Sequence, residues 1–240
     1  TRNVRRDFWP AEEIVARGYA AAAFYTGTVD PDKHDGFRNG IRGLLENPEE
    51  RRDDSWGTLA AWPWAAARVM DYFEVDEDID SARCAVVGHS RGGKTVLVAG
   101  ATDERIALVN DNASGAGGSA PFRYVGDGGE TIDIVNAIPS WFGPDMRRYI
   151  GHEADLPFDQ HCLLAAIAPR PLLCTYALGD RWSNPEGMIL CARAVNDVYR
   201  FLGAPDNLAF HLREGTHAHA PEDWAVLLDF IGRKWCQVRT

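Results

Sequence analysis

The stretch that decides the fold is Gly88-His89-Ser90-Arg91-Gly92-Gly93-Lys94-Thr95, which lies between an apolar run at 84–87 and a run of small and apolar residues at 95–101. It fits two patterns. As G-x-S-x-G it is a nucleophile elbow, a strained turn between a strand and a helix that exposes the serine. As G-x-x-x-x-G-K-T it is a phosphate-binding loop, with the lysine on the phosphates and the threonine on Mg²⁺. The rest of the chain has to distinguish between these two interpretations.

Later segments favour the nucleophile elbow. A serine hydrolase of this kind needs an acid and then a histidine, in that order, on loops that follow later strands. Asp180 follows a predicted strand at 171–177, and His217 follows a predicted strand at 208–212. We therefore predict that Ser90 attacks an acyl carbon, that His217 transfers the proton, and that Asp180 orients the imidazole.

The phosphate-binding interpretation needs an acidic residue at the end of a later apolar strand. Asp229 follows the apolar residues 225–228, but this segment begins with Pro221, Glu222 and Asp223. A proline followed by acids is typical of the start of a helix, so Asp229 is predicted to lie within a helix. A nucleotide hydrolase stays as the alternative from a different class.

Strand and helix signals alternate along the chain, which predicts an α/β fold with a mostly parallel sheet covered by helices on both faces. The predicted strands occupy 19–25, 84–87, 106–109, 171–177 and 208–212, and the predicted helices occupy 9–17, 62–73, 95–101, 188–202 and 223–235. Residues from about 112 to 158 form Gly-rich and aromatic stretches that are too long for an ordinary connection, which indicates a functional insertion. No linker or repeat interrupts the sequence, so a single domain over residues 1–240 is expected.

Composition narrows the function. The chain has 240 residues, 45% of them hydrophobic, and 25 basic against 35 acidic residues give a net charge of −10. No basic cluster is present, so no nucleic-acid partner is expected. No apolar run approaches the ~18 residues of a membrane span, so no membrane partner is expected. The five cysteines form no C-x-x-C pair, and the His217, His219 pair has no further ligands, so neither a metal nor a cofactor is expected.

The chain resembles the bacterial-type glucuronoyl esterases of carbohydrate esterase family 15, which have the α/β-hydrolase fold. The matching stretches run in order through most of the sequence: RGYA (17–20), DPD (30–32), WGT (56–58), AWPW (61–64), GHSRGGK (88–94), SGAGG (114–118), GET (129–131), WF (141–142), LPFDQH (156–161), APRP (168–171) and GTH (215–217).

This resemblance implies a carboxylic ester hydrolase that cleaves the ester between 4-O-methyl-glucuronic acid of glucuronoxylan and lignin alcohols. Ser90 and His217 match the family's nucleophile and base, and Arg91 matches an arginine that helps to hold the oxyanion. A carbohydrate or acetyl xylan esterase of broader specificity is the alternative within the same class.

Three further positions match residues that contact the hydroxyls and ring of the uronic acid: Lys94, Glu130 and Trp182. Their chemistry fits such a substrate, because a sugar ester offers hydroxyls to a charged donor and to a carboxylate, and a ring face to an indole.

The sequence departs from the family pattern in two places. Many members carry the catalytic acid as a glutamate just before the Ser-Gly that follows the strand after the elbow, and Ala113 stands there instead. Asp180 matches the acid position of other members, so it is the predicted triad acid. The opening strands of an α/β-hydrolase also have no counterpart, so we expect either a domain that is incomplete at its N-terminus or a sheet that closes differently. By the same resemblance, a secreted or periplasmic monomer is expected.

Overall fold

A four-stranded parallel sheet forms the centre of the protein. The computed structural model describes residues 7–34, 36–47 and 49–236. The strands are β1 (Ala85–His89), β2 (Leu108–Asn112), β3 (Leu172–Ala177) and β4 (Leu208–Arg213), and they lie in the order β1-β2-β3-β4. Every neighbouring pair is parallel, which confirms the predicted sheet type.

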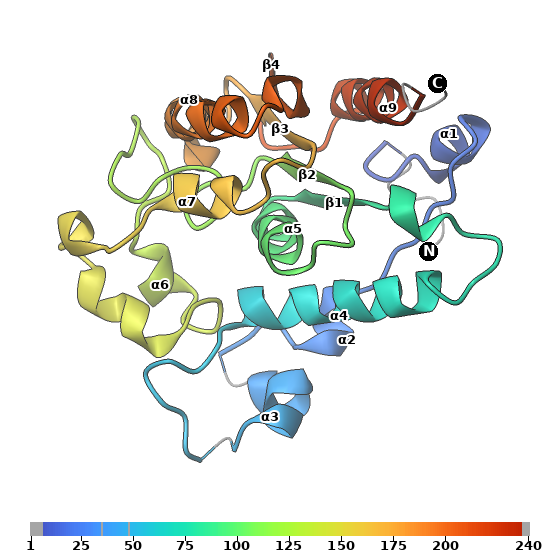
Figure 1. Ribbon diagram of the computed structural model, residues 1–240. Coiled ribbons are helices and arrows are strands. Elements are labelled where there is room, and N and C mark those ends of the chain that lie inside the picture. Colours follow the sequence, from blue (N-terminus) through green and yellow to red (C-terminus); the bar gives the residue numbers. More distant parts are fainter. Residues whose placement is uncertain (1–6, 35, 48, 237–240) are drawn as a thin grey trace.

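Helices cover both faces of this sheet (Figure 1). On one face, α4 (Thr58–Phe73), α5 (Arg91–Thr102) and α8 (Pro185–Phe201) share a buried core with Leu172, Cys174 and Tyr176 of β3. On the other face, α1 (Ala11–Ala16) and α9 (Pro221–Cys236) pack against Leu108 and Leu173. Consecutive side chains of a strand point to opposite faces, so these two cores divide β3 by alternate residues.

The segment between β2 and β3 builds a third core at the N-terminal end of α4. Its apolar side chains, with those of Leu59 and Trp62 from α4, form a buried cluster: Ala116, Phe122, Ile132, Ile134, Val135, Trp141 and Leu156. The first amides of α4 lack partners within the helix, and here Thr58 N–H donates to the Ser140 carbonyl over 2.7 Å. This contact explains why α4 begins at Thr58, four residues before the predicted start.

Shorter elements complete the chain. The remaining α-helices are α2 (Thr26–Val29), α3 (Ile41–Leu45), α6 (Ile134–Ala137) and α7 (Gln160–Ala165), and the 3₁₀ helices are η1 (Gly36–Asn39), η2 (Ser81–Arg83), η3 (Pro144–Tyr149), η4 (Glu153–Asp155), η5 (Arg181–Ser183) and η6 (Pro205–Asn207). None was predicted, because segments of three to six residues carry no measurable hydrophobic period.

The predicted strand at 19–25 is wrong. Those residues have no strand structure, and every residue from Ala20 to Tyr25 is exposed. An apolar run forms a strand only when a neighbour accepts its backbone hydrogen bonds. Within the described part of the chain, β1 pairs with β2 alone, and residues 19–25 join no sheet.

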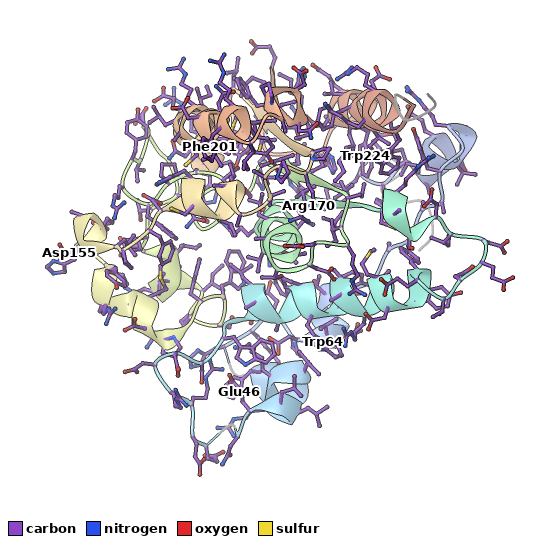
Figure 2. All side chains as sticks on the ribbon, in the orientation of Figure 1. Glu46, Trp64, Asp155, Arg170, Phe201 and Trp224 are labelled. Atoms are coloured by element: carbon purple, nitrogen blue, oxygen red, sulfur yellow. The ribbon has the colours of Figure 1, made fainter. Side chains whose placement is uncertain are left out.

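Other predicted elements are confirmed, with shifted ends. Helix α5 begins at Arg91, directly after Ser90, and not at 95, while β2 runs to Asn112 and not to 109. Side chains at helix surfaces range from enclosed to fully open: Trp224 of α9 is buried, whereas Phe201 at the end of α8 is 88% exposed (Figure 2). Among the described residues, no helix is both long enough and apolar enough to cross a membrane.

Candidate active site

Ser90 lies in a strained turn between β1 and α5. Its backbone φ is 58° and ψ is −122°, a conformation that non-glycine residues rarely adopt. A side chain at Gly88 would lie 2.1 Å from the Gly92 carbonyl oxygen, so only glycine lets the helix approach the strand here. A side chain at Gly92 would meet nothing, whereas one at Gly93 would lie 2.5 Å from Asp111. The turn therefore requires glycine at positions 88 and 93, whereas Gly92, the last glycine of the G-x-S-x-G pattern, is not sterically required.

The loops after β3 and β4 bring two distant residues to this turn. Sheet hydrogen bonds continue past the strands, from Leu178 N–H to the Arg213 carbonyl (2.8 Å) and from Gly179 N–H to the Gly215 carbonyl (3.0 Å). Asp180 follows Gly179 directly and His217 comes two residues after Gly215, so the pairing of β3 with β4 places them side by side.

Ser90, His217 and Asp180 are linked by hydrogen bonds. Nε2 of His217 lies 2.9 Å from Oγ of Ser90, and Nδ1 of His217 lies 2.6 Å from Oδ2 of Asp180. A carboxylate only accepts, so Nδ1 carries a proton and Nε2 is free to accept one from the serine. This is the geometry of a nucleophile, a general base and a residue that orients the base.

Ser183 also contacts this series, which the sequence did not indicate. Its hydroxyl donates to Oδ2 of Asp180 over 2.6 Å and lies 3.1 Å from Nδ1 of His217. Burial opposes the charge on the Asp180 carboxyl, but the hydrogen bonds from His217 and Ser183 outweigh that effect and lower its pKa below the ordinary value of 3.8. Asp180 is therefore ionised at neutral pH.

Arg213, at the end of β4, fixes the loop that carries His217. Its buried guanidinium donates to the carbonyls of Glu214 (3.0 Å) and Ala218 (2.6 Å), on either side of the histidine. Asp223 of α9 accepts from Arg213 Nε over 2.9 Å and from the Ala220 amide over 2.8 Å. The buried ion pair thus holds a loop that has no regular secondary structure.

Lys94 points away from the surface, although it lies one helical turn after Ser90. The side chain is 3% exposed, and its ammonium donates to the carbonyls of Ser114 (2.6 Å) and Ala116 and to Oε2 of Glu130 (2.7 Å). Burial lowers the pKa of Lys94, and the Glu130 carboxylate opposes that shift. All three ammonium protons therefore have acceptors within the protein.

Arg91 takes the opposite direction, toward solvent. Its side chain is 55% exposed, it forms an ion pair with Asp32, and its guanidinium lies 5.3 Å from the centre of the Trp141 ring. The other oxygen of Asp32 accepts from Nε1 of Trp141 over 2.7 Å. Asp32 and Trp141 together hold the Arg91 side chain beside the elbow, and sequence reasoning assigned no role to Asp32.

Trp182 is on the rim of the site. It is 57% exposed, and its carbonyl accepts from the Glu130 amide over 2.8 Å. An exposed ion pair of 2.8 Å between Arg181 and Asp127 joins the same two loops. The structure thus connects the loops of Glu130 and Trp182, which are predicted contacts for the sugar, but leaves the Trp182 indole open.

The phosphate-binding interpretation of Gly88 to Thr95 is not supported. The ammonium of Lys94 is enclosed, and Thr95 Oγ1 donates to the Arg91 carbonyl over 2.9 Å within α5. Asp229, the candidate acid, is in α9 and forms a surface ion pair of 2.6 Å with Arg17. Over the described ranges, no group of three or more His, Cys, Asp or Glu side chains is arranged to hold a metal ion.

Comparison with known proteins agrees with this geometry. The family model described as "Glucuronyl esterase, fungi" matches residues 51–203, so the chain belongs to the glucuronyl esterase family. Carbohydrate esterase MZ0003, from an unknown prokaryotic organism, is 40% identical over 249 residues, which cover 96% of this chain and 57% of the relative.

Solved structures also resemble the chain. The glucuronoyl esterase from Solibacter usitatus superimposes with a TM-score of 0.90 at 36% identity, over 98% of this chain and 64% of that one. A mutant of the Sporotrichum thermophile glucuronoyl esterase, in complex with methyl 4-O-methyl-β-D-glucopyranuronate, superimposes with a TM-score of 0.74 at 27% identity, over 87% and 59%. The fold is that of an α/β-hydrolase. The chain spans less than two thirds of the length of each of these proteins.

Proposed function

We propose that this protein is a serine esterase that hydrolyses esters of 4-O-methyl-glucuronic acid, with Ser90 as nucleophile, His217 as base and Asp180 as the triad acid. The observation that carries the proposal is the continuous series of hydrogen bonds from Ser90 through His217 to Asp180 on a strained elbow. Family membership adds the substrate class.

The proposed reaction follows from these contacts. Ser90 Oγ attacks the ester carbonyl while His217 Nε2 takes its proton, and Asp180 stabilises the imidazolium. His217 then returns the proton to the leaving alcohol, and an acyl-enzyme forms on Ser90. Water, activated by His217, attacks the acyl-enzyme and releases the uronic acid.

The oxyanion is stabilised by Arg91 in this proposal. Its amide is in the first turn of α5, where N–H groups have no acceptor within the helix and the helix dipole favours negative charge. Its guanidinium, held by Asp32 beside the elbow, adds a positive charge near the tetrahedral intermediate.

We assign the uronic acid ring to the loops of Glu130 and Trp182. The exposed indole of Trp182 offers a flat apolar surface to the sugar ring. The Glu130 side chain is only 5% exposed, so Glu130 does not contact the sugar as the sequence predicted, and it acts by holding the Trp182 loop through its amide. Lys94 acts through Glu130, because its own protons are already bonded. The natural substrate in this proposal is the glucuronoxylan–lignin ester, and a polymer of that size requires an enzyme that acts outside the cytoplasm.

Hydrolysis of benzyl glucuronate tests the proposal. The unaltered protein should release benzyl alcohol, and Ser90→Ala should reduce kcat by about 10⁴-fold or more, because no other nucleophile lies at the elbow. Ser81→Ala, a serine in η2, is the matched control and should keep full activity. Equal turnover by Ser90→Ala and the unaltered protein would rule out the assignment.

Specificity is tested by the exposed tryptophan. Trp182→Ala should raise KM for benzyl glucuronate by about tenfold through the lost ring contact, while hydrolysis of p-nitrophenyl acetate, which has no sugar ring, should not change. A broader carbohydrate or acetyl esterase would instead prefer the acetyl ester and show no effect of Trp182→Ala on either substrate.

A further inference from the structure

His89 precedes the nucleophile and contacts the base, although nothing in the sequence assigned it a role. Its ring centre lies 4.5 Å from that of His217, with an angle of 43° between the ring planes. His89 is the last residue of β1, and alternation along the strand places its side chain on the face covered by α1 and α9.

Three paired strand residues form a side-chain ladder on this face. The sheet register pairs His89 with Asn112, and Asn112 with Thr175. Nδ1 of His89 lies 2.5 Å from Oδ1 of Asn112, and Nδ2 of Asn112 lies 2.7 Å from Oγ1 and 3.3 Å from the carbonyl oxygen of Thr175. The ladder therefore crosses β1, β2 and β3 at their carboxyl ends.

This ladder determines the tautomer of His89. The Thr175 carbonyl only accepts hydrogen bonds, so the Asn112 atom that faces it is the NH₂ group. The opposite atom, Oδ1, only accepts as well, so Nδ1 of His89 carries a proton. Burial lowers the pKa of His89, which favours the neutral form of the ring, with its single proton on Nδ1. A neutral ring beside His217 does not repel the imidazolium that forms during the reaction.

The contact with His89 supplies a constraint that the triad lacks. The hydrogen bonds at Nδ1 and Nε2 of His217 come from Asp180, on a loop, and from Ser90, at a turn. The contact with His89 comes instead from a strand of the sheet, and it limits rotation of the His217 ring about its bond to Cβ. His217 is 38% exposed, so solvent does not supply the constraint from its open side.

Other aromatic rings support His89 from behind. The ring of Phe8 is nearly perpendicular to that of His89, with the ring centres 5.4 Å apart. The ring of His219 is nearly parallel to that of His89, with the centres 6.1 Å apart. His219 in turn stacks on Trp224 of α9, which is labelled in Figure 2, with the ring centres 4.5 Å apart. Burial lowers the pKa of His219 to about 3, so this second histidine is also uncharged.

We propose that His89 is a positioning residue for His217: the Thr175–Asn112–His89 ladder holds an imidazole of fixed orientation against the base and so keeps His217 Nε2 aligned with Ser90 Oγ. The inference rests on the proposed function only in that His217 serves as the base.

Labelling of Ser90 by a fluorophosphonate measures this alignment, because the rate depends on proton transfer to His217 and not on recognition of a sugar. His89→Ala should slow labelling by about tenfold or more, since small misplacements of a reacting group cost up to about a hundredfold. His89→Phe keeps a ring beside His217 but loses the hydrogen bond to Asn112, so it should label faster than His89→Ala and more slowly than the unaltered protein. With benzyl glucuronate, His89→Ala should lower kcat and leave KM within about twofold.

His211→Ala is the matched control. His211 is a partly buried histidine of β4 that contacts Glu222 at 2.9 Å, and its removal should leave the labelling rate unchanged. The proposal is overturned if His89→Ala labels at the unaltered rate, or if His89→Phe labels as fast as the unaltered protein, because the ladder would then have no part in the alignment. A purely structural role would lower the unfolding temperature without the partial rescue by phenylalanine.

Imidazole ¹³C and ¹⁵N chemical shifts of the unaltered protein test the ladder whether or not the alanine variant folds. They should show the Nδ1–H tautomer for His89, and the Nε2–H tautomer would overturn the proposal. The two proposals also fail separately. A protein that is labelled at Ser90 but does not hydrolyse benzyl glucuronate contradicts the substrate assignment, while the labelling rates still decide the role of His89.

Discussion

Two adjacent residues at the end of β2, Asp111 and Asn112, point to opposite faces of the sheet and belong to very different groups of polar side chains. Asn112 belongs to the face under α1 and α9, where the ladder of His89, Asn112 and Thr175 contains only neutral groups. Asp111 belongs to the face under α5, where its carboxylate accepts from Ser119 and lies near the buried ammonium of Lys94.

The difference shows how one strand end serves two purposes. The neutral ladder contacts His217, which becomes positively charged if it acts as the proposed base, so a cation in the ladder would oppose the reaction. The charged face anchors the insertion, because Lys94 and the Ser119–Tyr176 pair (2.7 Å) bind the loop at 114–119. Solvated loops at the strand ends, above both faces, carry the proposed chemistry.

The largest expected effect is a loss of activity from a change in the loops at the strand ends, with little change in the stability of the sheet. Asp180→Asn should reduce kcat for benzyl glucuronate by about 10⁴-fold, because an amide no longer selects the Nδ1–H tautomer of His217. The unfolding temperature should change little, and Asp127→Asn, an exposed acid paired with Arg181, should keep full activity. A comparable loss of kcat in Asp180→Asn and Asp127→Asn would contradict a specific role for Asp180.

Breaking the charged face should cost the most stability. Lys94→Met leaves the Glu130 carboxylate buried without its partner, so the free energy of unfolding should fall by about 3–5 kcal/mol. Urea denaturation measures it, with Lys33→Met, an exposed lysine, as the control. If Lys94→Met loses only activity and no stability, the lysine contacts the substrate directly and the anchoring role is wrong.

The pH dependence of stability should distinguish the two faces. Burial raises the pKa of Asp111 from 3.8 to about 6, so the native state holds this proton more tightly than the unfolded state does. The resulting stabilisation is complete below about pH 4 and is lost as the pH rises through about 6.

Asp111→Asn removes that titration. Relative to the unaltered protein, the variant should gain on the order of 1–3 kcal/mol of unfolding free energy between pH 4 and pH 8. Urea denaturation across this range measures the difference, and Asp54→Asn, an exposed acid paired with Arg52, should show none. If the difference in unfolding free energy between Asp111→Asn and the unaltered protein did not change with pH, the pKa of Asp111 would not be raised in the native state.

The smallest expected effect concerns the neutral ladder of His89, Asn112 and Thr175. Thr175→Val removes one acceptor of Asn112 Nδ2 and leaves the Thr175 carbonyl as the other, so unfolding free energy should fall by about 1 kcal/mol. Because the side chains of Thr175 and Asn112 do not titrate, the loss should be equal at pH 5 and pH 8. A loss that varies with pH would show that protonation of His89 is coupled to this hydrogen bond.

The three residues of the hydrogen-bonded series at the elbow could be predicted because their positions follow from chain order. Ser90, Asp180 and His217 each follow a strand signal within a few residues, and parallel strands bring such positions to one edge of the sheet. The supporting contacts could not be predicted in this way. Asp32 reaches Trp141 across 109 positions, and His89 lies under His217 because of the strand register. Neither relationship leaves a mark on local sequence.

The direction of side chains was the other limit. Arg91 and Lys94 are three residues apart and both carry a positive charge, yet one is 55% exposed and the other 3%. The predicted strand at 19–25 was wrong for a similar reason. An apolar run indicates that a segment favours burial, but it does not indicate whether a neighbouring strand is present to pair with it. The shifted start of α4 required a contact from residue 140, which no helix signal contains.

The ion pair of Arg213 with Asp223 has a consequence for the order in which the protein matures during synthesis. The loop that presents His217 takes its shape from Arg213, and Arg213 is fixed by an acid of α9. Ser90 and most of the sheet are translated long before this helix. The core beneath α5 and α8 can therefore form on a nascent chain while Ser90 still lacks a fixed histidine, and the proposed nucleophile gains its base only when α9 packs onto the other face.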